Sequence, residues 1–183
     1  MILAHQLLTY NAETGLNCMN NWYALYVKSR HEFVTQGELI RKGVCTFLPT
    51  VRRLSQWKDR KKLVELPLFP GYLFVYIQPD AESFVHVLRS RGAVDIVTAE
   101  PGVPASVPHE EIDSLMILLE SGQKIDIYPN LRQGTRVRVK RGPLHGAVGT
   151  LESREEQHKF LVNVDILGRS VGVMIFADDV EPL

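Results

Sequence analysis

Basic side chains gather in the front half of this 183-residue chain, and phosphate binding is the chemistry that they could do. Residues 22–76 hold ten Lys or Arg against four acids, although the whole chain has 21 of each sign. A local positive excess on a neutral protein indicates one polyanion site. The alternative is a merely solvated face. The densest run follows an aromatic residue that could stack on a base: Trp57, Lys58, Arg60, Lys61 and Lys62.

Residues that could catalyse a reaction or hold a metal are scattered. The six histidines have no Cys, His or carboxylate partner at ligand spacing, and Cys18 and Cys45 lack metal-ligand spacing and fit a reduced cytosolic protein. The chain also lacks a phosphate-cradling GxxxxGK loop. The sequence therefore predicts a binding protein, not an enzyme, and no cofactor or metal.

The most apolar stretch, residues 67–77, is the expected centre of the fold. Residues 72–78 are rich in β-branched and aromatic types and predict a strand buried on both faces. Pro67 and Pro70 cannot donate to a β-ladder, so pairing should start after Gly71. Phe69 and Pro70 then form a fixed apolar corner, which is either core or the floor of an exposed docking surface.

Elements on both sides of this strand follow from periodicity. Residues 22–28 alternate like a strand, and residues 29–32 (Ser-Arg-His-Glu) match a capping box at a helix start. Phe33, Gly37, Ile40 and Val44 then fall on one helical face. Residues 46–53 and 63–66 are expected to be strands of a protruding hairpin whose polar connection, residues 54–62, is cationic.

Two more helices complete the first domain. Asp80 is expected to cap a helix that ends by Gly92, a short strand follows at residues 94–98, and residues 100–108 are a loop. Pro108 suits the first turn of a helix with a buried stripe of Ile112, Leu115, Met116 and Leu119. The order β-α-β-β-β-α-β-α predicts an α+β fold, an α/β sandwich with a mainly antiparallel sheet over residues 20–121.

The remaining segments have different residue patterns. Residues 122–133 lack periodicity and are expected to be a linker, and residues 134–183 form short alternating runs broken by glycines, which predict a small β-barrel. Residues 1–19 are expected to be a tail without a signal peptide. Because no apolar run approaches the length of a membrane span, we expect no membrane partner. With the reduced cysteines, this favours a cytoplasmic protein, which we expect to be a monomer.

Three segments together resemble the NusG family of transcription elongation factors. Residues 22–28 (Trp-Tyr-Ala-Leu-Tyr-Val-Lys) and 69–75 (Phe-Pro-Gly-Tyr-Leu-Phe-Val) are similar to its N-terminal domain, and residues 134–149 are similar to its KOW domain. Any one motif is weak, but the ordered set is specific and covers residues 22–183. The compact hairpin resembles the specialised RfaH-like paralogues. The glycines of the C-terminal segment are closer to general NusG proteins, so we expect a stable barrel and not the helical form that RfaH can adopt.

The resemblance implies three binding sites. An apolar depression would dock on the clamp helices of RNA polymerase through Tyr26, Phe69, Pro70, Tyr72 and Phe74. From the residues alone, these side chains would more often be core. The non-template DNA strand would contact Lys28, Arg41, Lys42, Arg89 and Arg91, and the hairpin cations could extend that track. Such contacts position DNA without reading its sequence.

The third implied site is on the KOW domain. There, Rho or a small-subunit ribosomal protein would contact the residues that match the family's partner-binding loops: Leu144, Ile166, Leu167 and Arg169. Leu144 stands where the family often has Phe, and Ile166 and Leu167 could also be ordinary core. The rival hypothesis is an RNA-binding or ribosome-associated KOW protein that acts through charge alone, although residues 134–183 are nearly neutral.

Overall fold

The computed structural model describes residues 20–57, 60–129, 134–154 and 157–183. These residues divide into two compact units, an N-terminal unit of residues 20–106 and a C-terminal unit of residues 107–183. The division falls before the last helix, whereas the sequence places the domain boundary after it, at residue 121. The reason lies in the C-terminal unit, where that helix packs against the sheet.

An antiparallel sheet forms the centre of the N-terminal unit and confirms the expected strand at its heart. Its strands follow one another in the order β2 (Cys45–Phe47), β5 (Tyr72–Ile77), β1 (Asn21–Val27) and β6 (Ala93–Ile96). Every residue of β5 except Tyr72 and Tyr76 is buried, as expected for a strand covered on both faces. The register places Tyr26 opposite Tyr72, and Ala24 opposite Phe74.

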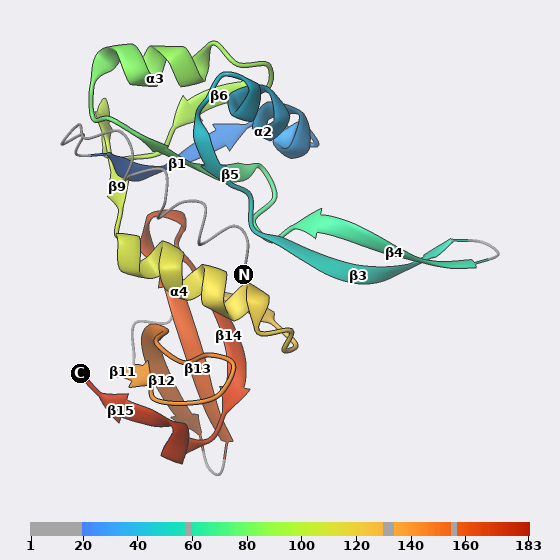
Figure 1. The fold of residues 1–183 in the computed structure, drawn as a ribbon, viewed down its shortest axis with the longest axis vertical. Coiled ribbons are helices and arrows are strands. Elements are labelled where there is room, and N and C mark those ends of the chain that lie inside the picture. Colours follow the sequence, from blue (N-terminus) through green and yellow to red (C-terminus); the bar gives the residue numbers. More distant parts are fainter. Residues whose placement is uncertain (1–19, 58–59, 130–133, 155–156) are drawn as a thin grey trace. The chain divides into compact units, whose positions relative to one another are not determined.

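Helices α2 (Glu32–Arg41) and α3 (Ala81–Leu88) cover one face of this sheet (Figure 1). Leu39 of α2 and Val87 of α3 are fully buried against strand residues such as Leu25 and Leu73. Asp80 caps α3 as the sequence predicts, because its Oδ1 accepts a hydrogen bond of 2.8 Å from the backbone N–H of Ser83. The capping interaction also keeps the pKa of Asp80 below its ordinary value.

The start and the orientation of α2 differ from the sequence-based expectation. The helix begins at Glu32 with His31 as its N-cap and has no side-chain cap, so the predicted capping box is wrong. Two residues of the predicted apolar stripe face outward, with Phe33 46% and Ile40 58% exposed, whereas Val44 after the helix packs against the core. Glu32, Thr35 and Leu39 are buried in its place. Glu32 and Thr35 can be buried although they are polar, because each forms a hydrogen bond to the backbone of a neighbouring loop.

The cationic hairpin is longer than expected. Strands β3 (Thr50–Trp57) and β4 (Arg60–Pro67) pair along their full length, so most of the expected connection is strand. In the part of the chain that the structure describes, they pair with no other strand. Figure 1 shows this ribbon projecting from the sheet of the N-terminal unit. The expected loop at residues 100–108 also contains short strands, β7 (Thr98–Glu100), β8 (Val103–Pro104) and β9 (Ser106–Val107).

The C-terminal unit confirms the expected β structure. A six-stranded antiparallel sheet carries helix α4 (His109–Glu120), which packs on β12 and β13. Strand β10 falls within the expected linker. In sheet order the strands are β10 (Asp126–Pro129), β14 (Arg169–Ile175), β13 (Gln157–Val164), β12 (Val148–Arg154), β11 (Thr135–Val139) and β15 (Val180–Pro182). Two 3-10 turns, η1 (Asp165–Leu167) and η2 (Ala177–Asp179), flank β14.

Candidate functional site

Two tyrosines form an accessible aromatic pair at the end of the N-terminal sheet. Tyr26 on β1 and Tyr72 on β5 are cross-strand partners, and their ring centroids lie 5.4 Å apart. Tyr26 is 44% exposed, Tyr72 is half-buried, and Pro70 beside them is exposed. Aromatic side chains that keep part of their surface in water are the anchors that protein interfaces favour.

Phe69 and Phe74 do not share this exposure. Phe69 is 1% and Phe74 0% exposed, and their rings meet edge to face with centroids 6.3 Å apart. The expectation that Phe69 lies on the surface is therefore wrong, because its ring turns away from the solvent-facing Pro70 and packs against Phe74. Of the five residues expected at the polymerase surface, Tyr26, Pro70 and Tyr72 are accessible in this structure.

The corner that carries Pro70 is fixed at Gly71. The Gly71 N–H donates to Oε1 of Glu32 at 2.8 Å, and the Gly71 carbonyl accepts from the N–H of Val27 at 2.8 Å. Gly71 has φ +85°, a backbone conformation that favours glycine, and an added Cβ would lie 3.4 Å from the ring of Tyr26. The corner therefore has one conformation, held from both β1 and α2.

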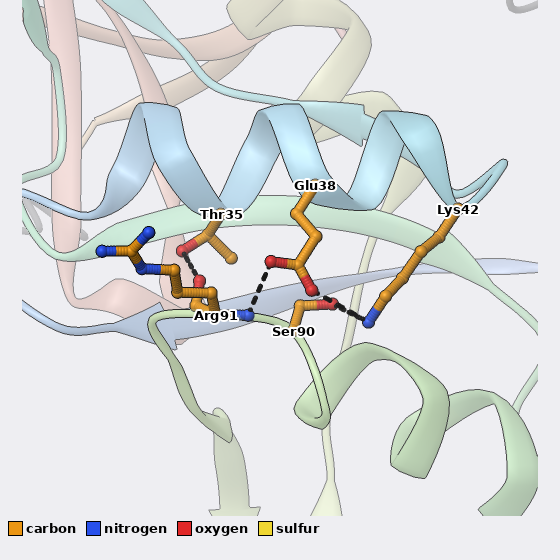
Figure 2. A network of polar contacts seen from close by, with 5 residues as sticks. All are labelled: Thr35, Glu38, Lys42, Ser90 and Arg91. Carbon is orange, nitrogen blue, oxygen red and sulfur yellow. Dashed lines mark hydrogen bonds and ion pairs between the residues drawn. The ribbon is translucent and has the colours of Figure 1, made fainter.

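A second loop, residues 89–92, lies along α2 (Figure 2). Thr35 Oγ1 donates to the carbonyl oxygen of Arg91 at 2.8 Å, and Oε2 of Glu38 accepts from the Arg91 N–H at 3.1 Å. Lys42 Nζ donates to Oγ of Ser90 at 2.8 Å and lies 3.3 Å from Oε1 of Glu38. The loop backbone is thereby attached to one face of the helix.

Outside the hairpin, the cations predicted to bind DNA differ in accessibility. Lys28, Arg41, Arg89 and Arg91 have exposed side chains. Lys42 is partly buried, and its ammonium points at Glu38 and Ser90 (Figure 2). The hydrogen bond from the Arg91 backbone, with the charges of Lys42 and Arg41, holds the pKa of Glu38 below its ordinary value, so the Glu38 carboxylate stays ionised at neutral pH.

Both loops meet the same end of β1. The N–H of Val27 bonds to Gly71, and the N–H of the next residue, Lys28, donates to the carbonyl of Gly92 at 2.8 Å. The aromatic corner and the Gly92 end of the cationic loop are therefore bonded to consecutive residues at one end of β1.

Of the predicted hairpin residues, Trp57, Arg60, Lys61 and Lys62 lie in the paired ends of β3 and β4. The backbone places Trp57 opposite Arg60, Gln56 opposite Lys61 and Ser55 opposite Lys62. Their side chains, and Lys58 as a whole, lie outside the described residues. The DNA contact predicted for them stays a prediction.

The residues predicted to bind a partner on the C-terminal unit lie in two loops. Leu144 is 2% exposed in the turn before β12, so its side chain is core in this structure. Ile166 and Leu167 are half-buried in η1, and Arg169 is exposed. Gly168, with φ +60°, lets the chain leave η1 and enter β14.

Helix α4 bonds to a residue next to the first loop and to a residue of the second. Oγ of Ser114, which is 2% exposed, accepts from the N–H of Val148 at 2.9 Å, next to the Leu144 turn. Oε2 of Glu111 accepts from the N–H of Asp165 at 3.4 Å, at the start of η1, and Glu110 pairs with Arg136. Partial burial, with the charges of Asp165 and Glu110, raises the pKa of Glu111 to about 7.

Sequence reasoning missed Glu32, Thr35, Glu38 and Ser114. The four-residue spacing of Glu38 and Lys42 is a helical ion-pair signal and was available. The capping-box pattern predicts a partner for Glu32 three residues away, whereas its partner in the structure, Gly71, is distant in sequence. No local pattern identifies such a partner.

Metal binding and membrane insertion find no support in the described residues. Among them, no three His, Cys, Asp or Glu are grouped so that they could hold a metal ion. Burial raises the pKa of the Cys45 thiol to about 11, so this cysteine stays protonated and unreactive. None of the described helices combines the length and apolar character needed to cross a membrane.

Comparisons with known proteins agree on one family. The family model described as "Transcription termination factor nusG" matches residues 20–116, which is more than half of the chain. "Transcription termination/antitermination protein NusG" of Helicobacter pylori is 30% identical over 179 residues, covering 90% of this chain and 99% of the relative. The protein of the same name from Borreliella burgdorferi is 24% identical over 180 residues, covering 88% and 98%.

One solved structure, titled "Domain interaction in Thermotoga maritima NusG", is 22% identical with a TM-score of 0.47, covering 90% of this chain and 97% of the other. The match to the family model and the identity to the Helicobacter relative establish the family of this chain from sequence alone. The chain belongs to the NusG family of transcription termination and antitermination factors.

Proposed function

We propose that the N-terminal unit docks on the clamp helices of RNA polymerase through Tyr26, Pro70 and Tyr72, and holds the non-template DNA strand on the exposed cations around residues 89–92. In this function the protein would act in the cytoplasm as a monomer, without chemistry of its own. It would lower pausing by keeping the polymerase clamp and the displaced strand in one arrangement.

The convergence of both loops on β1 carries this proposal. Val27 and Lys28 are consecutive, and their N–H groups bond to Gly71 in the aromatic corner and to Gly92 in the cationic loop. A protein surface and a nucleic-acid surface that share one strand end suit a factor that bridges the two. Aromatic anchors supply affinity for a protein helix, and exposed Arg and Lys supply contacts to phosphates.

Under this proposal the C-terminal unit recruits a further protein, either Rho or a small-subunit ribosomal protein, through η1 and Arg169. Ile166 and Leu167 are half-buried there and keep part of their surface accessible. Because Leu144 is buried, it would support this site from within and would not contact the partner directly.

A pull-down with the isolated clamp-helix region tests the docking surface. We expect the wild-type chain to be retained and the double variant Tyr26→Ala, Tyr72→Ala to be lost. Phe176→Ala is the matched control, because Phe176 is an aromatic residue with 78% exposure in the C-terminal unit. Equal retention of the double variant and the control would contradict the proposed polymerase surface.

A further inference from the structure

Glu38 is an acidic residue at the centre of a surface proposed to bind an anion. Its carboxylate accepts from the Arg91 N–H at 3.1 Å and lies 3.3 Å from Lys42 Nζ. The same ammonium donates to Ser90 Oγ at 2.8 Å. The side chains of Lys42 and Glu38 are 25% and 24% exposed, so this ion pair is largely turned toward the protein.

The peptide of Arg91 is held at both of its polar atoms. Glu38 binds its N–H, and Thr35 Oγ1 donates to its carbonyl at 2.8 Å (Figure 2). The next residue, Gly92, has φ +88°, and an added Cβ would lie 2.6 Å from Thr35 Oγ1 and 2.7 Å from Cβ of His31. Three points on α2 therefore fix the loop, while the side chains of Arg89 and Arg91 stay exposed.

We propose that Glu38 and Lys42 are positioning residues, which clamp residues 89–92 so that Arg89 and Arg91 meet the phosphates of single-stranded DNA, and that Lys42 itself contacts no phosphate. This inference rests on the proposed DNA contact and goes further. It removes one cation from the binding surface, and it gives an acidic side chain a favourable role in binding a polyanion.

The physical reason is preorganisation. A mobile loop must be ordered when its arginines bind, and that ordering reduces affinity, whereas a clamped loop has already been ordered by folding. Simple counting of charges makes the opposite prediction for Glu38, because its removal leaves the surface more positive by one charge and should tighten DNA binding. The two explanations therefore differ in the sign of the effect.

Fluorescence anisotropy with the full chain and a labelled oligothymidine, measured over a series of NaCl concentrations, separates them. We expect Glu38→Ala to weaken binding by about three- to tenfold despite its added positive charge, since the loop loses its order. Glu38→Gln, which keeps an acceptor for the Arg91 N–H, should restore most of the affinity. Glu82→Ala on α3 removes one exposed acid outside the clamp and is the matched control for charge.

The salt dependence distinguishes a phosphate contact from a positioning role. Arg89→Ala and Arg91→Ala should each reduce the slope of log K against log salt by about 0.7, the value for one phosphate of a single strand. Lys42→Met should weaken binding and leave the slope unchanged. Thr35→Val, which changes no charge and is similar in size, should do the same.

Four results would overturn the inference. One is tighter binding by Glu38→Ala than by Glu82→Ala, and another is a slope reduced by about 0.7 in Lys42→Met, which would make Lys42 a phosphate ligand. A third is unchanged affinity in Thr35→Val. The fourth is a wild-type chain that does not bind the oligonucleotide, which would remove the proposed DNA contact and the inference with it, whereas the first three leave that contact intact.

Discussion

The carboxylate of Glu32 and the backbone N–H of Gly71 form a buried hydrogen bond of 2.8 Å that joins the first turn of α2 to the corner carrying Pro70. Glu32 is 4% exposed. A buried carboxylate is tolerated in proteins when it is hydrogen-bonded, and a buried N–H requires an acceptor. Each group satisfies the other, so the polar residue at the start of α2 is part of the architecture.

Replacing Glu32 should therefore destabilise the N-terminal unit. Glu32→Ala leaves the N–H of Gly71 without its acceptor, and we expect a loss of about 2–3 kcal/mol in the free energy of unfolding. Glu32→Gln keeps an acceptor oxygen and should lose about half as much. Urea denaturation followed by Trp fluorescence measures both, and equal stability of Glu32→Ala and the wild type would contradict the role given to this bond.

Gly92 offers a test of close packing against α2. Gly92→Ala places a Cβ against Thr35 and His31 and also strains the positive φ, so we expect a loss of about 2–3 kcal/mol in stability. Gly43→Ala is the matched control, because Gly43 has φ +78° and nothing within 4 Å of its Cβ position. The control should lose only about 1 kcal/mol from backbone strain. Similar losses for the two variants would show that the 89–92 loop is not packed as described.

Ser114 tests the attachment of α4 to the C-terminal sheet. Its hydroxyl oxygen is the acceptor for the buried N–H of Val148, so Ser114→Ala should reduce the stability of the C-terminal unit by about 1–2 kcal/mol. Amide hydrogen exchange of β12 and β13 reports this unit separately. Unchanged exchange in Ser114→Ala would argue against the contact.

Glu111 should make the C-terminal unit less stable as the pH rises. In the unfolded chain the carboxyl loses its proton near pH 4.5, whereas in the folded unit its pKa is about 7. This pH-dependent destabilisation is therefore absent below about pH 4.5 and grows until the pH passes 7, where we expect about 1–2 kcal/mol after allowance for solvent screening.

Glu111→Gln should remove this dependence and stabilise the unit at pH 8. Urea denaturation followed through the Val148 and Asp165 amide signals by NMR measures the effect at pH 5 and pH 8. In the wild type, the Asp165 signal should also titrate with a midpoint near pH 7, since its N–H donates to Glu111. The absence of any transition near pH 7 would show that Glu111 is well hydrated.

The strands were predictable where one pattern dominated. Residues 72–78 are rich in β-branched and aromatic types, which favour a strand, and β5 spans all but the last of them. The cap of α3 was also predictable, because Asp80 acts on a residue three positions away. Both signals are local, so the sequence contains them in full.

The orientation of α2 was not predictable from its own residues. Apolar spacing favoured burial of Phe33 and Ile40, but the inward face carries Glu32 and Thr35 because Gly71 and Arg91 present backbone groups there. Satisfying those groups outweighs the burial of an apolar stripe, and their positions depend on the tertiary structure. For the same reason, the family resemblance implies a DNA contact for Lys42 and does not show that Glu38 and Ser90 bind it.

The two anchors of α2 have a mechanical consequence. Glu32 holds the aromatic corner and Glu38 holds the cationic loop, six residues apart on one helix, so their axial separation is about 9 Å at a rise of 1.5 Å per residue. The helix thus sets the distance between the loop proposed to face the polymerase and the loop proposed to face DNA. Inserting one residue between the anchors would rotate one relative to the other by about 100°. Residues on the outer face of α2 can therefore be substituted freely. The number of residues between Glu32 and Glu38 cannot change without displacing one of the two loops.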